Sequence, residues 1–275
     1  MEWEEAMSSE EHEGPEREEP LTGGNSNMGV VRVGDTVRRA MTPRSPTIHR
    51  LLRHLEAKGF TGCPRLLGVD ERGREILTYL PGDVGFLPYL WEGDDALIAA
   101  ANLLRGYHDA VRDFKTEPGD AWSYAHPDPS RHEIICHNDF APYNWVCQDE
   151  KPYAAIDFDD AGPGPRLRDV AYAVYWMAPL TFGGGPMAEM AHAELADGSR
   201  RLKLFCSCYG VDATPELLNL TQDALRLLRD WIKTGAEAGD PARARMVEQG
   251  QYEYWELETR AFAQNRPALE RSLFG

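Results

Sequence analysis

Polar side chains that can bind a cation or accept a proton gather between residues 137 and 157. His137 and Asp139 follow the short apolar run Ile134–Cys136. Asn144 lies five residues after Asp139, and Asp157 ends a second apolar run. Carboxylate and amide oxygens are the ligands that Mg²⁺ prefers. Two carboxylates and an amide around one ion suit phosphoryl transfer, in which the metal neutralises phosphate charge and another group orients the incoming hydroxyl.

A predicted hairpin brings the two ends of this segment together. The runs Trp145–Cys147 and Tyr153–Ile156 read as strands joined by a turn at residues 149–152. Pairing of these strands places Asn144, which enters the first strand, close to Asp157, which leaves the second. A single His-x-Asp pattern arises often by chance. The specific signal is the combination of an apolar run that leads into His137 and Asp139, Asn144 five residues later, and a second apolar run that leads into Asp157.

The run His137-Asn138-Asp139, with Asn144 and then Ile156-Asp157-Phe158-Asp159, resembles the aminoglycoside phosphotransferase family of small-molecule kinases. The resemblance extends over roughly residues 21–260. It implies a two-lobed, protein-kinase-like α+β fold, with ATP or GTP and Mg²⁺ as cofactors. It also implies that a small molecule bearing a hydroxyl group is the acceptor of the phosphate.

The resemblance assigns a role to each residue of the motif. Asp139 would be the catalytic base, which accepts a hydrogen bond from the acceptor hydroxyl. Asn144 and Asp157 would hold Mg²⁺ against the nucleotide phosphates. His137 would brace the loop, and Asp169, in Arg168-Asp169-Val170, would anchor it.

The nucleotide would lie against the N-terminal part of the chain. By the same resemblance, backbone groups near Tyr79 and Leu80 would bind adenine, and the loop 23–27 would cover the phosphates. The third strand of such kinases carries a phosphate-binding lysine, but no lysine precedes Lys58 here. We therefore assign the phosphate contact to Arg39, which keeps the charge and can bind phosphate with two N–H groups.

The acid that would pair with Arg39 is not evident from the sequence. Kinases of this kind use an acid on the neighbouring helix, and Glu56 is the only acid in the predicted helix 45–58. The register of that helix is uncertain enough that His49 could face the cleft in place of Glu56. Both alternatives stay open at this point.

The remaining patterns predict the elements that position these residues. Residues 21–80 form a predicted N-lobe, with a hairpin around Gly34-Asp35, a helix over 45–58 and strands over 65–69 and 75–80. Residues 81–275 form a predicted C-lobe, with a helix from residue 94 or 95, a strand at 134–136, and helices over about 215–236 and 241–264. The expected fold is a small antiparallel sheet with one helix, followed by a larger helical lobe.

The charge of the chain divides into two parts. The 275 residues carry a net charge of −16, and residues 1–20 account for half of it with nine glutamates and one arginine. We expect this segment to be a disordered acidic tail. The body is only mildly acidic, so no nucleic-acid partner is expected. No membrane partner is expected either, because no apolar run reaches the roughly 20 residues of a membrane span.

The predicted function is Mg²⁺-dependent transfer of a nucleotide γ-phosphate to a hydroxyl group. The acceptor stays open among aminoglycosides, macrolides, choline, homoserine and sugars, and the oligomeric state is unknown. Five cysteines without a disulfide framework favour a cytoplasmic location. The first alternative is a non-catalytic, pseudokinase-like nucleotide-binding module, because the usual lysine is missing. The second is a metal-dependent hydrolase that would use His137, Asp139 and Asp157.

Overall fold

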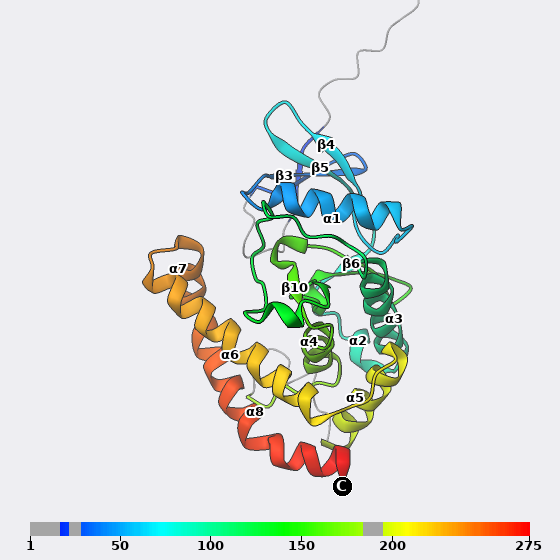
Figure 1. Ribbon diagram of the computed structural model, residues 1–275, viewed down its shortest axis with the longest axis vertical. Coiled ribbons are helices and arrows are strands. Elements are labelled where there is room, and N and C mark those ends of the chain that lie inside the picture. The colour runs from blue at the N-terminus through cyan, green and yellow to red at the C-terminus, as the bar shows by residue number, and fades with distance from the viewer. Residues whose placement is uncertain (1–16, 22–28, 184–194) are drawn as a thin grey trace, which may run out of the picture.

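The structure, a computed structural model, describes residues 17–21, 29–183 and 195–275. Its N-terminal part is a five-stranded antiparallel sheet in the order β1-β2-β3-β5-β4, with helix α1 beside it (Figure 1). The hairpin, the helix and the two further strands expected here are confirmed, with ends that differ by a few residues. The elements are β1 (Glu19–Pro20), β2 (Val31–Val33), β3 (Thr36–Ala40), α1 (Ser45–Ala57), β4 (Leu66–Val69) and β5 (Arg74–Thr78).

The pairing of β3 with β5 determines what faces the interior. Arg39 lies directly opposite Glu75, and Val37 lies opposite Leu77. Side chains alternate between the two faces of a strand, and directly opposed residues share a face. Because Glu75 and Leu77 are both buried, Arg39 is carried on the inner face of the sheet.

Part of the expected acidic tail is ordered. Residues 1–16 lie outside the described residues, whereas Glu19 and Pro20 pair with Arg32 and Val31 as strand β1. Glu18, just before this strand, forms ion pairs of 2.8 Å with Arg74 and 3.0 Å with Arg72. Residues 18–20 are therefore held by backbone pairing with the edge of β2 and by two arginine side chains.

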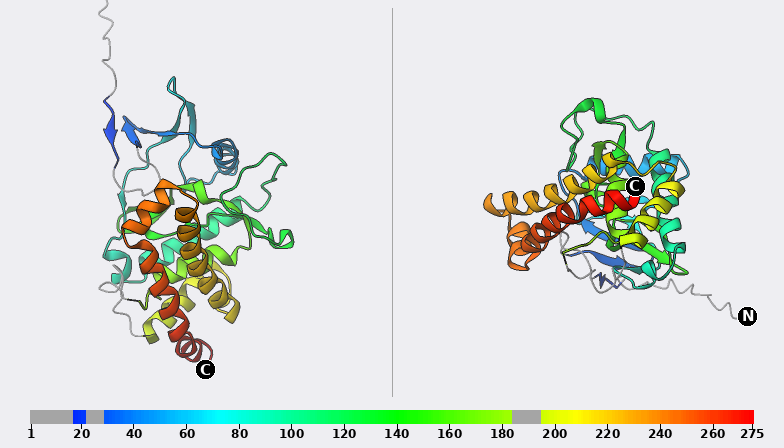
Figure 2. Two further views of the ribbon diagram at one scale, coloured as in Figure 1. Left: turned by 90° about the vertical axis from the view of Figure 1, so that its left-hand side faces the viewer. Right: turned by 90° about the horizontal axis from the view of Figure 1, so that it is seen from below.

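The C-terminal part is mostly helical and lies below the sheet in Figures 1 and 2. It contains two small antiparallel sheets, β7-β10 and β6-β8-β9. The strands are β6 (Asp83–Val84), β7 (Ile134–Cys136), β8 (Trp145–Gln148), β9 (Lys151–Ala155) and β10 (Gly162–Gly164). The helices are α2 (Tyr89–Glu92), α3 (Asp95–Ala110), α4 (Leu167–Met177), α5 (Leu195–Tyr209), α6 (Pro215–Glu237), α7 (Pro241–Glu248) and α8 (Gln251–Phe274).

The predicted strands at 134–136 and around 145–156 are confirmed, and Trp145 pairs with Ala155. The single helix expected over 241–264 is wrong, because the chain forms two helices, α7 and α8, on either side of Gly250. Gly250 has a φ of 76°, a left-handed conformation that ends one helix and lets the chain turn into the next. No helix among the described residues has the length and apolar character needed to cross a membrane.

One apolar core joins the two parts. It includes Leu51 and Leu55 of α1 as well as the buried helix α4 and the aromatic side chains of Phe140 and Trp145. Helix α4 lies at the centre, and the long helices α6 and α8 run past it on one side (Figure 1). The loop that follows β7 is therefore fixed from both sides by packed elements.

Candidate active site

The loop after β7 is held by a buried carboxylate. Asp169, in the first turn of α4, accepts hydrogen bonds from the backbone N–H groups of His137 (2.6 Å) and Asn138 (2.8 Å). His108 of α3 bonds the same carboxylate through Nε2 at 3.0 Å. Burial alone would raise the pKa of Asp169, but the His108 hydrogen bond and the backbone N–H donors hold it below its usual value. Asp169 is thus an ionised anchor of the loop.

His137 lies behind the loop and braces it. The side chain is fully buried, and its Nε2 lies 3.1 Å from the carbonyl oxygen of Ile156. Burial lowers the pKa of His137, so the ring is neutral and Nε2 donates to that carbonyl. This hydrogen bond ties the end of β7 to the residue just before Asp157.

Asp139 is placed where it can accept a proton. The Tyr143 hydroxyl donates to its Oδ1 at 2.5 Å, and the Asn144 amide nitrogen donates to its Oδ2 at 2.7 Å. Removal of water from around the carboxylate raises the pKa of Asp139 to about 7, although the Tyr143 hydrogen bond lowers it. A carboxylate with a raised pKa is a stronger base, which suits general-base chemistry near neutral pH.

The hairpin brings Asn144 and Asp157 together as expected. The backbone N–H of Ile156 donates to the carbonyl oxygen of Asn144 at 2.9 Å, which fixes the two chain segments side by side. Asp157 follows in a left-handed conformation (φ 62°) that turns it out of the strand. The Asn144 amide nitrogen is committed to Asp139, so the amide oxygen is the atom that remains to bind a ligand.

These two residues fit a divalent cation. Oδ1 of Asp157 is buried and accepts no hydrogen bond. Burial and the nearby charge of Asp159 raise the pKa of Asp157, whereas Arg39, at 3.5 Å from Oδ1, acts to lower it. No cluster of three or more His, Cys, Asp or Glu side chains suited to a metal occurs among the described residues. Mg²⁺ is often held in proteins by one or two carboxylates while substrate phosphates supply the rest.

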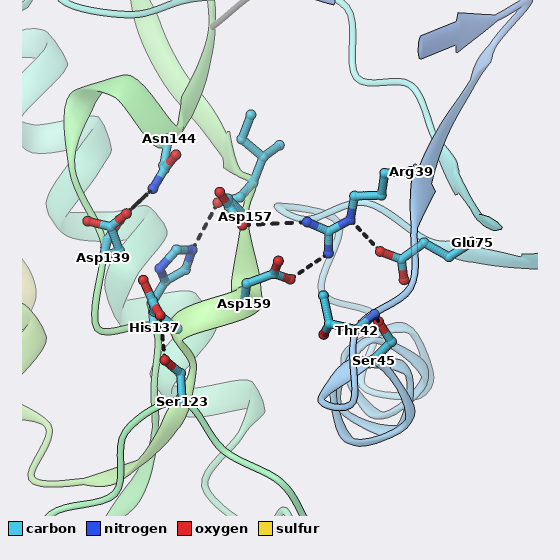
Figure 3. Close-up of polar contacts among 12 residues, drawn as sticks. Arg39, Thr42, Ser45, Glu75, Ser123, His137, Asp139, Asn144, Asp157 and Asp159 are labelled. Carbon is cyan, nitrogen blue, oxygen red and sulfur yellow. Dashed lines mark hydrogen bonds and ion pairs between the residues drawn. The ribbon is translucent and has the colours of Figure 1, made fainter. Parts of the chain in front are cut away.

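Arg39 lies across the cleft from these residues (Figure 3). Its guanidinium pairs with Glu75 through Nε, with Asp159 at 2.7 Å and with Asp157 at 3.5 Å. Burial acts to lower the pKa of Arg39, but the three carboxylates together raise it, so the guanidinium stays charged. Three acids around one arginine leave an excess of negative charge, and phosphates could enter only with a further cation to balance it.

The acid that pairs with Arg39 is Glu75, which the sequence reasoning missed. Glu75 is 1% exposed, and its second oxygen lies 2.5 Å from Nε2 of His49. Glu56, one of the two candidates, instead approaches Arg65 at 3.7 Å. The other candidate, His49, is buried, contacts Glu75 and lines neither cavity. The strand register contained the missing signal, since Arg39 and Glu75 are directly opposed across β3 and β5.

A cavity of about 360 Å³ separates the sheet from the β8-β9 hairpin. Every predicted nucleotide and metal residue lines it, namely Arg39, Tyr79, Leu80, Asn144 and Asp157. The Tyr79 backbone N–H is already used, because it donates to the carbonyl oxygen of Asp35 at 2.8 Å. The backbone groups left for a base are therefore the Tyr79 carbonyl and those of Leu80. The predicted phosphate loop at 23–27 lies outside the described residues.

A second cavity of about 330 Å³ lies on the other side of the loop. Asp139 lines it, whereas its hydrogen-bond partners Tyr143 and Asn144 line the first cavity. The far wall of the second cavity is a face of α6. Asp139 therefore borders the second cavity and is hydrogen-bonded to two residues that border the first.

Comparison with known proteins agrees with this geometry. Residues 85–205 match the sequence model of a family described as the phosphotransferase enzyme family. The resemblance to this family is confirmed. The trifolitoxin immunity protein of Rhizobium leguminosarum bv. trifolii is 36% identical over 164 residues, which are 58% of this chain and 62% of that protein. The chain thus spans less than two thirds of that relative.

Solved structures show the same fold. The GDP complex of aminoglycoside 2'-phosphotransferase-IIIa superposes with a TM-score of 0.59 at 16% identity, over 92% of this chain and 95% of that one. A choline/ethanolamine kinase family protein from Mesorhizobium loti gives a TM-score of 0.58 at 16% identity, over 93% and 91% of the two chains. The fold is the two-lobed, protein-kinase-like fold that the sequence predicted.

Proposed function

We propose that the protein transfers the γ-phosphate of ATP or GTP to a hydroxyl group of a small molecule. The observation that supports this most directly is the position of Asp139 between two cavities. The first cavity would hold the nucleotide against Tyr79 and Leu80. The second would hold the acceptor, with its hydroxyl hydrogen-bonded to Asp139.

The chemical step needs few protein groups. The acceptor oxygen forms a bond to the γ-phosphorus while Asp139 takes the proton of the hydroxyl group. The bond between the γ-phosphorus and the oxygen that bridges the β- and γ-phosphates breaks, and the nucleoside diphosphate leaves. Arg39 would bind the phosphates, and Glu75 would hold its guanidinium in place. Asn144 and Asp157 would hold Mg²⁺, which when bound neutralises phosphate charge. Catalysis in such a site comes mainly from positioning and electrostatic stabilisation.

The test compares variants in transfer and in nucleotide binding. We expect Asp139→Ala to lower transfer by about 10²–10⁴-fold, the usual contribution of a general base, while Mg-nucleotide binding measured by calorimetry persists. Asp157→Ala should lose both transfer and Mg-nucleotide binding. Asp113→Ala is the matched control, because Asp113 is an exposed aspartate, paired with Lys58, that lines neither cavity.

The assay uses both ATP and GTP with a panel of aminoglycosides, macrolides, choline, homoserine and sugars. Trifolitoxin joins the panel because the relative found by sequence is an immunity protein against it. Undiminished transfer by Asp139→Ala would refute the role of this residue. Nucleotide binding without transfer to any acceptor would instead favour a non-catalytic, pseudokinase-like module.

A further inference from the structure

One wall of the second cavity is an apolar face of α6. Beside Asp230, α6 presents there a mainly apolar set at helical spacing: Ala224, Leu227, Leu228, Trp231 and Thr234. Leu227 is 41% exposed and Trp231 is 37% exposed. Large apolar side chains left exposed in a concave site are the usual contact surface for the apolar part of a small ligand.

Trp231 is held in place before any ligand arrives. The Arg243 guanidinium lies 3.9 Å from the centre of the indole ring and also binds Asp240 at 2.7 Å. This approach depends on Gly235, since a Cβ atom there would lie only 1.8 Å from Cδ of Arg243. One face of the indole is thus covered by a cation, which is a favourable contact for an aromatic ring.

The acids of this cavity already have partners. Asp139, Asp160 and Asp230 are the acids that line it among the described residues. The Ser123 hydroxyl donates to Asp160 at 2.6 Å, and Arg229 donates to Asp230 at 2.8 Å. Asp139 accepts the hydroxyl and amide hydrogen bonds described above. Arg229 thus neutralises Asp230, which leaves Asp139 and Asp160 as the carboxylates that could attract a positive charge on a ligand.

The cavity also contains a fixed positive charge. Arg168 lines it, donates to the Asn138 side chain at 2.7 Å, and lies 4.0 Å from the centre of the Tyr124 ring. This guanidinium offsets the charge of one of the two carboxylates that have no arginine partner, Asp139 and Asp160. A ligand with several positive charges would therefore find fewer partners than charges, and each buried charge without a partner costs free energy.

Resting on the proposed function, we propose that the acceptor is an amphipathic alcohol with at most one positive charge. Its ring or other apolar face lies on Leu227, Leu228 and Trp231, and its hydroxyl reaches Asp139. The specificity of the site comes from this apolar face of α6, and Arg243 fixes the position of Trp231. Polycationic aminocyclitols are excluded as substrates by the same features.

The decisive variants are a matched pair of exposed leucines. Leu227→Asp puts a carboxylate on the apolar face, whereas Leu257→Asp puts one on α8, where Leu257 is 50% exposed and lines neither cavity. We expect Leu227→Asp to raise the KM for an amphipathic alcohol by about tenfold or more, because burial of a leucine side chain is replaced by desolvation of a charge. Leu257→Asp should leave KM unchanged, and thermal melting should show both variants folded.

A second variant tests Trp231 without touching the cavity. Gly235→Ala displaces Arg243 from the indole and should raise the acceptor KM about threefold, with kcat and the nucleotide KM unchanged. A merely structural effect of the substitution would instead lower the melting temperature and alter both KM values. Equal KM for the acceptor in wild type and Gly235→Ala would count against the positioning of Trp231.

The acceptor panel distinguishes the inference from the proposed function. It pairs uncharged and singly charged ring alcohols with polycationic aminocyclitols, and nucleoside diphosphate release is measured with each. Transfer to aminocyclitols by the wild type with a KM that Leu227→Asp leaves unchanged would overturn the inference while leaving the phosphotransferase activity intact. Lack of transfer to every ring alcohol would also overturn it. If the wild type released no more nucleoside diphosphate than Asp139→Ala, with or without an acceptor, the proposed function itself would be wrong.

Discussion

Asp139 and Asp169 are two aspartates at the same loop whose pKa values shift in opposite directions. Burial acts to raise the pKa of both carboxyl groups. Asp169 accepts two backbone N–H groups and a histidine, so its pKa falls, whereas Asp139 accepts only the Tyr143 hydroxyl and the Asn144 amide, and its pKa rises to about 7. The number and type of hydrogen-bond donors therefore determine the direction in which the pKa of each buried carboxyl group shifts.

The largest expected effect is a difference in stability between the two Asn variants. Asp169→Asn removes a buried charge that holds two backbone N–H groups and His108, so the free energy of unfolding should fall by about 3 kcal/mol. Asp139→Asn removes a poorly compensated charge, so stability should stay unchanged or rise at pH 8. Urea denaturation of both variants measures the difference, and equal losses would show that the two carboxylates do not differ in this way.

A smaller effect is expected at Tyr143. Tyr143→Phe removes the hydroxyl that donates to Oδ1 of Asp139, and we expect kcat to fall about tenfold, in line with loss of one hydrogen bond to a charged group. The nucleotide KM should stay unchanged. Tyr172→Phe is the matched comparison within the second cavity, which Tyr172 lines, because its hydroxyl lies 2.9 Å from the Tyr143 hydroxyl and makes no hydrogen bond to Asp139 itself. A larger fall in kcat for Tyr172→Phe than for Tyr143→Phe would contradict the direct contact of Tyr143 with Asp139 as the cause.

The smallest effect concerns the dependence of stability on pH. Burial lowers the pKa of both His108 and His137, whereas histidines in an unfolded chain titrate near pH 6.5. As the pH falls below about 6.5, these two rings therefore bind more protons in the unfolded state than in the folded state, and their contribution to stability falls. The raised pKa values of Asp139 and Asp157 act in the opposite direction, so the share of one ring is measured as a difference between variant and wild type. Each histidine contributes at most about 1.4 kcal/mol per pH unit.

His137→Gln should reduce this slope by the share of one histidine. The free energy of unfolding is measured at several pH values between 6.5 and 5 for the wild type and the variant. His132→Gln serves as the control, because His132 is an exposed histidine that lines neither cavity. An unchanged slope in His137→Gln would show that this ring titrates alike in the folded and unfolded states.

The sequence predicted those parts of the site that depend on local pairing. The hairpin around Trp145 and Ala155 follows from strand patterns on either side of a turn, and it places Asn144 beside Asp157. The sequence patterns did not reveal the partner of Arg39, because the pairing acid was expected on the neighbouring helix. Glu75 lies 36 residues away on another strand, and only the register of β3 against β5 brings the two together.

Other features depend on tertiary contacts that have no local pattern. The Tyr143 hydroxyl reaches Asp139 only because the chain makes a short helical turn over Pro142–Asn144. The division of α7 from α8 depends on Gly250, which a helical pattern of apolar residues does not reveal. Strand β1 forms because the edge of β2 is free to pair with it. Composition reports nothing of that edge, so the acidic residues predicted a disordered tail.

Strand β1 has a practical consequence for handling the protein. Leu21, directly after β1, lines the first cavity and donates its backbone N–H to Val30 at 3.0 Å. An affinity tag fused directly ahead of residue 17 would therefore lie only a few residues from the wall of the first cavity. The C-terminal residue, Gly275, lies at the opposite end of the molecule from the sheet (Figure 1). A tag placed after Gly275 is the better choice for kinetic and calorimetric work.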